Sequence, residues 1–457
     1  MRMTAVSLSG ADPVGRLYFD GVHYVRLVAP GLERAVGDLF SSGLIKALVE
    51  RGLFPETVEL PIAGDGQVPC GHSLAVRHRA LTPLVYPREW SFAMLQAAAL
   101  RFLELVELAF SYGYTLKDAH PFNMVFYGTV PIWVDLGSFC KILPEQPHPW
   151  LRDFLINYLT PLRIWDKYPF VVRKIAGSPL QGLDHAECVR LTFLPLGRGT
   201  IVENICKIIS KLSYIDNYRG RNILISAAKA LLGRDTKSRL AKLRTKVQVL
   251  KGSHGTPWKT YHKEYLTNNL VPSVLSERFE HIFARISKTK PRSVLELAGN
   301  AGVLSEAIAR RMPEVSVICT DNDSQAIDAL FRRLECAVVS NLSFAVLDFM
   351  CTEYSSAELE PDERLRSDVV LALAVTHHLL LTQGYSFSDI FAAIKRYACR
   401  SVFIEYMPLG LHDGVQAPEK PDWYTEENFR RAFEEYFSLD CVDHLEENRV
   451  LFCGSIK

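Results

Sequence analysis

The sequence lacks several features that mark particular classes of protein. Its ten cysteines contain no Cys-x-x-Cys pair, so the common structural zinc motifs are excluded. No cationic start followed by an apolar segment marks a secretory signal, and no run of about 20 residues stays apolar throughout. We therefore expect a reduced, cytoplasmic chain without a membrane-spanning helix.

The sequence also has almost no net charge. Its 52 Lys and Arg against 51 Asp and Glu give a formal charge of +1. This balance provides no overall field that would attract nucleic acid or an anionic membrane. We expect no nucleic acid as a partner, and the oligomeric state stays open.

A chain of 457 residues is longer than one hydrophobic core usually organises, so two domains are expected. From residue 16 to 233, short strand-like runs surround one long amphipathic segment at 91–113, which is an α+β pattern. The stretch 234–251 then holds seven Lys and Arg against one Asp. Because its leucines and valine recur at helical spacing, it predicts a docked helix rather than a phosphate-binding surface. We place a first domain at 1–233, a basic helix and linker at 234–255, and a second domain at 256–457.

In the second domain, apolar strand patterns alternate with amphipathic helix patterns from residue 293 onward. Such alternation predicts a doubly wound, mostly parallel α/β sheet. The last two strand patterns, 438–445 and 449–456, are separated only by a short turn. They should form an antiparallel hairpin at the edge of the sheet.

Small residues follow the first strand of this domain, in the run Glu296-Leu-Ala-Gly-Asn-Ala-Gly302. They allow a ligand to approach the backbone, and the N–H groups of the next helix favour polar or anionic groups. The dinucleotide fingerprint fits poorly, because Ala301 and Leu304 stand where it needs glycine. A nucleotide-like cofactor other than NAD is therefore expected.

This run resembles the first motif of the class I S-adenosylmethionine-dependent methyltransferases, with alanine and asparagine at two usual glycine positions. The resemblance implies a Rossmann-like methyltransferase domain. It also implies that Asp321 accepts hydrogen bonds from the ribose hydroxyls, that Asp348 lies at the adenine amino group, and that Glu296 faces the methionine amino group. The implied cofactor-binding set is Glu296, Ala298, Gly299, Asn300, Gly302, Asp321 and Asp348.

Methyl transfer requires a positioned acceptor, and it requires a base only if the acceptor must lose a proton. His377 and His378 follow the fourth strand and Glu405 ends the fifth, so these three are the catalytic candidates. Tyr261 and His262 precede the first strand. They are candidates for covering the cofactor or, alternatively, for packing as part of an amphipathic helix.

In the first domain, Asp118 is followed by Asn123 and then by Asp135 within Asp-x-Gly. This spacing resembles the catalytic and metal-binding loops of aminoglycoside phosphotransferase-like kinases. The resemblance implies a kinase-like α+β domain in which Asp118 is the base, while Asn123 and Asp135 hold magnesium against ATP. A Gly-rich loop is missing, and Arg26 stands where that family has its lysine. An active phosphotransferase, a bifunctional enzyme and a scaffold without chemistry therefore all stay open.

Taken together, several segments along the whole chain resemble the NoeA family of rhizobial nodulation proteins. The segments are 86–92, 114–123, 296–302, 377–384 and 403–411. This resemblance implies methylation of a small or saccharide-like acceptor in host-specific nodulation, which is the leading functional hypothesis.

Overall fold

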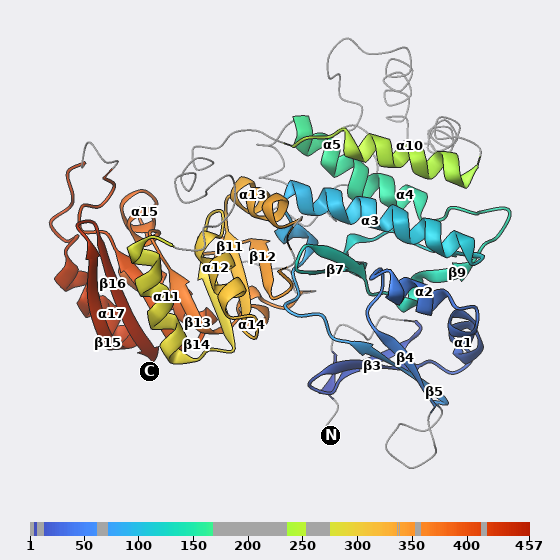
Figure 1. Ribbon diagram of the computed structural model, residues 1–457, viewed down its shortest axis with the longest axis horizontal. Coiled ribbons are helices and arrows are strands. Elements are labelled where there is room, and N and C mark those ends of the chain that lie inside the picture. Colours follow the sequence, from blue (N-terminus) through green and yellow to red (C-terminus); the bar gives the residue numbers. More distant parts are fainter. Residues whose placement is uncertain are drawn as a thin grey trace, which may run out of the picture. The chain divides into compact units, whose positions relative to one another are not determined.

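A computed structural model of the chain shows two units (Figure 1). Unit 1 comprises Met1–Thr82, Tyr86–Arg88 and Phe92–Ser253, and unit 2 comprises Pro83–Val85, Glu89–Ser91 and His254–Lys457. The residues that the structure describes are 4–6, 13–61, 72–167, 235–252, 275–335, 337, 339–351, 358–412 and 418–457. Among the helices in these ranges, none combines the length and the apolar composition needed to cross a bilayer.

Unit 2 is built on a seven-stranded sheet with the order β12-β11-β10-β13-β14-β16-β15. The first five of these strands pair in parallel, whereas β16 runs antiparallel to both of its neighbours. The strands are β10 (Ser293–Leu297), β11 (Ser316–Asp321), β12 (Leu342–Val346), β13 (Ser367–Ala372), β14 (Ala398–Tyr406), β15 (Phe437–Glu446) and β16 (Arg449–Ile456). The predicted mostly parallel sheet and its terminal antiparallel hairpin are confirmed.

The structure adds which strand of the hairpin lies outermost, which the prediction did not specify. β16 inserts between β14 and β15, so that only β15 forms the edge of the sheet. The sequences of the two strands explain this order. β16 carries a nearly continuous buried run, whereas the side chains of β15 are mostly exposed or half-buried. An apolar strand gains more from a central position.

Helices connect the strands and cover the sheet (Figure 1). Several begin at side-chain caps: Asp323 accepts from the N–H of Gln325, and Ser386 forms a capping box with Asp389. The described helices are α11 (Glu277–Thr289), α12 (Val303–Arg311), α13 (Ser324–Leu334), α14 (Pro361–Arg364), α15 (Thr376–Leu381), α16 (Phe387–Tyr397) and α17 (Glu426–Tyr436).

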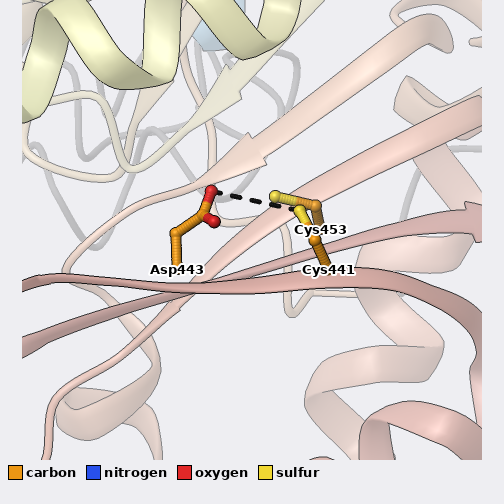
Figure 2. Close-up of side chains that lie close together, drawn as sticks. All are labelled: Cys441, Asp443 and Cys453. Carbon is orange, nitrogen blue, oxygen red and sulfur yellow. Dashed lines mark hydrogen bonds between the residues drawn. The ribbon is translucent and has the colours of Figure 1, made fainter.

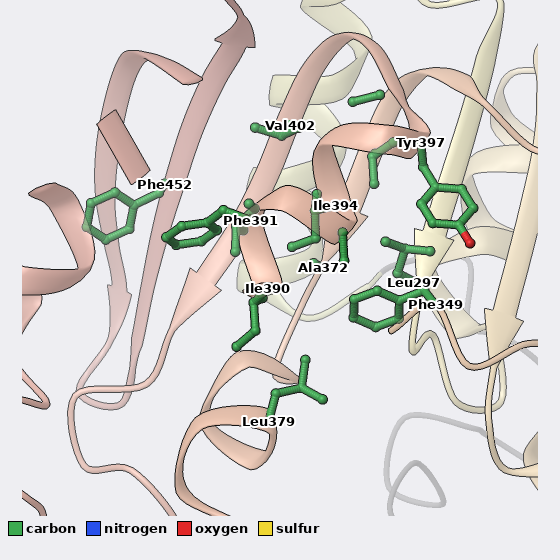
Figure 3. Packing of buried hydrophobic residues seen from close by; sticks show 14 of the residues in the cluster. Leu297, Phe349, Ala372, Leu379, Ile390, Phe391, Ile394, Tyr397, Val402 and Phe452 are labelled. Carbon is green, nitrogen blue, oxygen red and sulfur yellow. The ribbon is translucent and has the colours of Figure 1, made fainter. Parts of the chain in front are cut away.

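One apolar core cluster of unit 2 packs α15, α16 and α17 against the sheet (Figure 3). Ile394 and Phe391 of α16 are fully buried against residues of the strands, including Ala372 and Val402. Burying aliphatic and aromatic side chains in this way supplies about 1.5–3 kcal/mol each before the opposing entropy is counted. This packing holds the carboxyl ends of β10, β13 and β14 in fixed register.

The order of the strands creates a switch point between β10 and β13. The chain passes from β10 to β11 and β12 on one side, and then returns to β13 on the other side of β10. The loops that leave β10 and β13 therefore diverge. In open α/β sheets, ligands bind in the crevice at the carboxyl ends of strands at such a point.

Unit 1 contains a five-stranded sheet with the order β1-β2-β3-β5-β4, and all its strand pairs are antiparallel. Two further antiparallel pairs, β6–β9 and β7–β8, follow the long helix α3. The strands are β1 (Thr4–Ala5), β2 (Gly15–Phe19), β3 (His23–Val28), β4 (Thr57–Pro61), β5 (Leu74–Arg79), β6 (Tyr114–Leu116), β7 (Met124–Tyr127), β8 (Val130–Trp133) and β9 (Phe139–Lys141). The predicted α+β pattern is confirmed.

Helix α3 is the centre of unit 1, and most of its side chains are buried. Phe102 of this helix packs against the rings of Trp133, Trp150, Phe154 and Tyr158. The described helices of unit 1 are α1 (Glu33–Ser41), α2 (Leu44–Glu50), α3 (Phe92–Ser111), α4 (Leu151–Phe154), a π-helical turn (Leu155–Leu159), α5 (Thr160–Lys167) and α10 (Thr236–Gln248).

The basic stretch predicted to be a docked helix is α10, and it packs against α3. Leu240, Leu243 and Val247 are buried, while Gln96 of α3 donates to the carbonyl oxygens of Val247 and Leu250. The apolar side of α10 is therefore docked, as the spacing of its leucines and valine predicted.

Candidate functional site

The loop after β10 has an unusual backbone. Ala298, Asn300 and Gly302 adopt left-handed conformations, with φ of 54°, 49° and 65°. A Cβ atom on Gly299 would lie 2.8 Å from the Cys319 sulfur, so this position also has no room for a side chain. The sequence placed alanine and asparagine at two usual glycine positions, and both do adopt the conformation that favours glycine.

A second left-handed residue of this kind follows β13, where Ala374 has a φ of 51°. Of the four non-glycine residues with positive φ in the described part of the chain, three thus follow β10 and β13, and the other is Lys290. An alanine in this region costs about 1–2 kcal/mol. Such strain persists where surrounding structure enforces it, and here it flanks the switch point of the sheet.

Asp321, the last residue of β11, is tied to the loop after β10. Its Oδ2 accepts from the N–H of Asn300 at 2.8 Å, and its Oδ1 accepts from the N–H of Asp323 at 2.7 Å. The carboxylate is nearly buried. Two hydrogen bonds from backbone groups fix its orientation at the carboxyl edge of the sheet.

Glu296 lies beneath the same loop and is 5% exposed. Its Oε2 accepts from the hydroxyl of Ser305 at 2.5 Å and from the N–H of Ser305 at 3.2 Å. Burial raises the pKa of Glu296 to about 7, despite the opposing effect of these hydrogen bonds and of Arg278. A buried carboxyl that titrates near neutral pH responds strongly to any charge brought beside it.

Asp348 follows β12 and is exposed. Its Oδ1 accepts from the N–H of Met350 at 3.0 Å, while the neighbouring Phe349 is buried in the core. Together, Glu296, Asp321 and Asp348 follow or lie in three neighbouring strands. They place carboxyl groups along one edge of the sheet.

His377 and His378 lie in α15, directly after the strained Ala374, with ring centroids 4.0 Å apart. His377 is buried, and burial lowers its pKa to about 3, with smaller contributions from His378 and Arg449. Its Nδ1 is buried without a hydrogen-bond partner among the described residues. Such an atom is free to form a hydrogen bond with a bound group.

Glu405, the third catalytic candidate, is fully buried at the end of β14. Its two oxygens accept from Nε and Nη2 of Arg278 at 2.6 and 2.7 Å, and Nη1 of Arg449 lies 3.3 Å from Oε2. Its backbone carbonyl accepts from the Thr376 hydroxyl. Because the two guanidinium groups occupy both of its oxygens, this arrangement favours a positioning role over the role of base.

The structure thus brings the predicted cofactor-binding residues to one edge of the sheet, with His377 on the helix that follows β13. Tyr261 and His262 lie outside the described residues. Sequence reasoning missed Ser305, Arg278 and Ala374. Ser305 in the first turn of a helix after the small-residue run was a usable signal, whereas nothing in the sequence links Arg278 to Glu405.

A second group of predicted residues lies in unit 1. Oδ1 of Asp118 accepts from Nδ2 of Asn123 at 3.0 Å and from the N–H of His120 at 3.3 Å. Asp135, after β8, accepts from the N–H of Gly137 at 2.8 Å. Burial raises the pKa of Asp135, Arg26 opposes this effect, and the charge of Asp118 adds to it. Asp118, Asp135 and Arg26 are therefore close enough for their charges to interact.

We expect Ala374→Gly to increase the free energy of unfolding by about 1 kcal/mol, because glycine adopts positive φ without the steric cost that alanine bears. Urea denaturation measures this change. The matched control is Ala372→Gly, two residues earlier in β13, which should decrease stability because it weakens a buried strand. Equal destabilisation by both changes would contradict the strain at Ala374.

We expect Glu296→Gln to remove a pH dependence of stability. Because the folded chain holds the Glu296 proton up to a pKa of about 7, whereas the unfolded chain loses it near the ordinary 4.5, wild-type stability falls by up to about 3 kcal/mol across this interval. The free energy of unfolding of Glu296→Gln, relative to that of wild type, should therefore increase from pH 4.5 to 7 and then stay constant. Urea denaturation at several pH values measures this difference.

The control for this change is Glu280→Gln. The hydrogen bonds from Arg311 lower the pKa of Glu280 to about 2, so ionised Glu280 stabilises the wild-type fold at neutral pH. This stabilisation is lost as the pH falls below the ordinary glutamate pKa. At neutral pH, the free energy of unfolding should be higher than that of wild type in Glu296→Gln and lower than that of wild type in Glu280→Gln. A pH-independent effect of Glu296→Gln would show that this carboxyl is not the buried titrating group.

Comparison with known proteins gives the following similarities. No protein-family model matches the chain. Nodulation protein NoeA of Rhizobium meliloti (strain 1021) is 24% identical over 424 residues, which span 88% of this chain and 85% of that protein. The predicted similarity to NoeA is therefore confirmed along most of the chain.

Among solved structures, the SAM-bound magnesium protoporphyrin IX methyltransferase ChlM from Synechocystis PCC 6803 matches 45% of this chain and 100% of its own, at 13% identity and a TM-score of 0.30. The N-methyltransferase NodS from Bradyrhizobium japonicum WM9 matches 40% of this chain and 98% of its own, at 11% identity and a TM-score of 0.29. The chain is thus similar in sequence to a nodulation protein and, over less than half its length, to structures of methyltransferases.

Proposed function

We propose that unit 2 is an S-adenosylmethionine-dependent methyltransferase that acts on a small or saccharide-like acceptor. The observation that carries this proposal is the switch point between β10 and β13, where both outgoing loops contain left-handed alanines and three neighbouring strands lead to carboxyl groups. The similarity to NoeA supports a role in nodulation, and the domain that performs the chemistry is the predicted 256–457.

The charge of the site favours this cofactor over a dinucleotide. Glu296, Asp321 and Asp348 put carboxyl groups around the loop, and these would repel a pyrophosphate but attract a sulfonium and an ammonium group. In the proposed arrangement, Asp321 accepts from the ribose hydroxyls and Asp348 from the adenine amino group. Gly299 and Gly302 allow close approach, and Glu296 lies near the methionine amino group.

The bound cofactor supplies the methyl group as an electrophile. The residues of the chain then orient the acceptor, and His377 is the group that we assign to it, because its buried Nδ1 has no hydrogen-bond partner among the described residues. The low pKa keeps this imidazole neutral and able to accept a hydrogen bond from a hydroxyl or amino group. His378 lies beside it, and Glu405 holds Arg278 and Arg449 in place.

Isothermal titration with S-adenosylhomocysteine tests this proposal. Wild-type protein should bind it, and Asp321→Ala should weaken binding by about tenfold to a hundredfold, because hydrogen bonds to a charged acceptor are lost. The matched control is Asp368→Ala, which removes a buried carboxylate from the amino end of β13, at the opposite edge of the sheet. Equal affinity of folded Asp321→Ala and wild type would place the cofactor elsewhere.

A second candidate function belongs to unit 1, for which we infer a kinase-like domain over 1–233. The hydrogen bond between Asp118 and Asn123 and the nearby charge of Asp135 support phosphotransfer with magnesium and ATP. In this arrangement Asp118 is the base, and Asn123 and Asp135 supply oxygen ligands to the metal. The chain is then a bifunctional enzyme if both sites are active.

We expect Asp135→Asn to abolish magnesium-dependent ATP binding, since it removes a charged metal ligand. Titration of the full chain with ATP in the presence and absence of magnesium measures this loss. Asp38→Asn, which alters a carboxylate that pairs with Lys141 at the surface, is the control and should bind as wild type does. If Asp135→Asn binds ATP as wild type does, the phosphotransfer hypothesis is wrong. If the chain binds neither ATP nor S-adenosylhomocysteine, a scaffold without chemistry is the remaining hypothesis.

A further inference from the structure

Two cysteines face each other across the terminal hairpin of unit 2. Cys441 of β15 and Cys453 of β16 are directly paired residues in the antiparallel register. Both are free thiols, and Figure 2 shows them beside Asp443. The two sulfur atoms and a carboxylate oxygen of Asp443 all lie within 4.8 Å of one another.

The backbone already meets the requirement for a disulfide. Opposed residues of an antiparallel pair have Cα atoms about 4.5 or 5.5 Å apart, and both values lie within the range of about 4.4–6.8 Å that disulfides adopt. The side chains leave the hairpin on the same face, since both thiols approach Asp443. The pairing of Cys441 with Cys453 therefore brings the two thiols to positions that a disulfide can join.

The two thiols differ in their surroundings. Cys453 is buried, whereas Cys441 is half-buried and reachable from solvent. The thiol of Cys441 donates to Oδ2 of Asp443 at 3.9 Å. Burial raises the pKa of Cys453, so this thiol stays protonated and shielded until its partner has reacted.

The same group of residues is less suited to a metal ion. Arg285 of α11 donates to both oxygens of Asp443, at 2.8 and 2.7 Å, and Nε2 of His281 lies 2.9 Å from Oδ2. A cation bound by Asp443 would have to displace the Arg285 guanidinium or lie beside it, and like charges repel. The contacts around Asp443 therefore favour chemistry of the thiol pair alone.

We propose that Cys441 and Cys453 form a reversible disulfide when the chain meets a peroxide. The Cys441 thiol gives up its proton to water, and the sulfur attacks one peroxide oxygen. The O–O bond breaks, Cys441 becomes a sulfenic acid, and the leaving hydroxide takes a proton to form water. Cys453 then loses its proton and attacks this sulfur, the S–O bond breaks, and a second water leaves. Two thiols are oxidised and one peroxide is reduced.

The new bond would join the edge strand β15 to the inner strand β16. An edge strand has a neighbour on one side only, so it separates from the sheet more easily than an inner strand does. The bond closes a loop through the hairpin turn and restricts the unfolded chain. The modification site does not depend on the proposed methyltransferase activity, because its residues lie outside the cofactor-binding set.

Peptide mapping of the full-length protein tests the site. The reduced protein is treated with hydrogen peroxide, its remaining thiols are alkylated, and it is digested with trypsin. Cleavage after Arg431 and Arg449 puts Cys441 in peptide 432–449 and Cys453 in peptide 450–457. We expect a linked pair of these peptides that lacks two hydrogen atoms and disappears on reduction. In parallel, the thermal midpoint of unfolding should rise on oxidation and return on reduction.

Variants separate this pair from general thiol oxidation. Cys399→Ser removes an exposed thiol of β14 and should leave the linked peptides unchanged. In Cys453→Ser the link should be absent, and Cys441 should accumulate as a sulfenic acid that dimedone labels. If that variant does not fold, Cys441→Ser removes the half-buried thiol instead, and the linked peptides should again be absent. Independent alkylation of both cysteines after peroxide treatment would overturn the proposal, and so would stoichiometric zinc that protects both thiols.

Discussion

The hydrogen bonds that Asp321 accepts from Asn300 and Asp323 are the constraint on which the candidate site of unit 2 depends. They join the end of β11 to the loop that leaves β10, and so hold that loop in its left-handed conformation. Without such an anchor, Ala298 and Asn300 would relax toward ordinary backbone angles. The parallel pairing of β10 with β11 makes this contact possible, because it brings the two strand ends to the same edge.

Two buried glutamates at this edge show how surroundings decide the role of a residue. Glu296 accepts from Ser305, and the charge of Arg278 acts on it only weakly compared with burial, so its proton is held to near neutral pH. Glu405 is as deeply buried, yet Arg278 and Arg449 neutralise it. The first carboxyl is therefore available to respond to a cationic ligand. The second serves to position two guanidinium groups beneath the helix that carries His377.

The candidate site of unit 1 is built differently, because its contacts are short-range in sequence. Asp118, His120 and Asn123 interact within one turn of chain, and Asp135 caps the next turn through Gly137. The antiparallel pairs β6–β9 and β7–β8 bring these turns together, and Trp133 at the end of β8 packs against Phe102. The spacing of these residues in the sequence therefore describes most of the geometry of this turn region.

Local patterns in the sequence predicted the seven strands of unit 2, its helices α12, α13, α16 and α17, and the small-residue loop, because hydrophobic periodicity and turn chemistry act over a few residues. The sequence also predicted the docked helix α10 from the spacing of its apolar residues. The tertiary structure was needed to show that β16 lies inside β15, that Arg278 pairs with Glu405 at a sequence separation of 127, and that Ala374 is left-handed. These features depend on packing between distant segments, which local patterns do not encode.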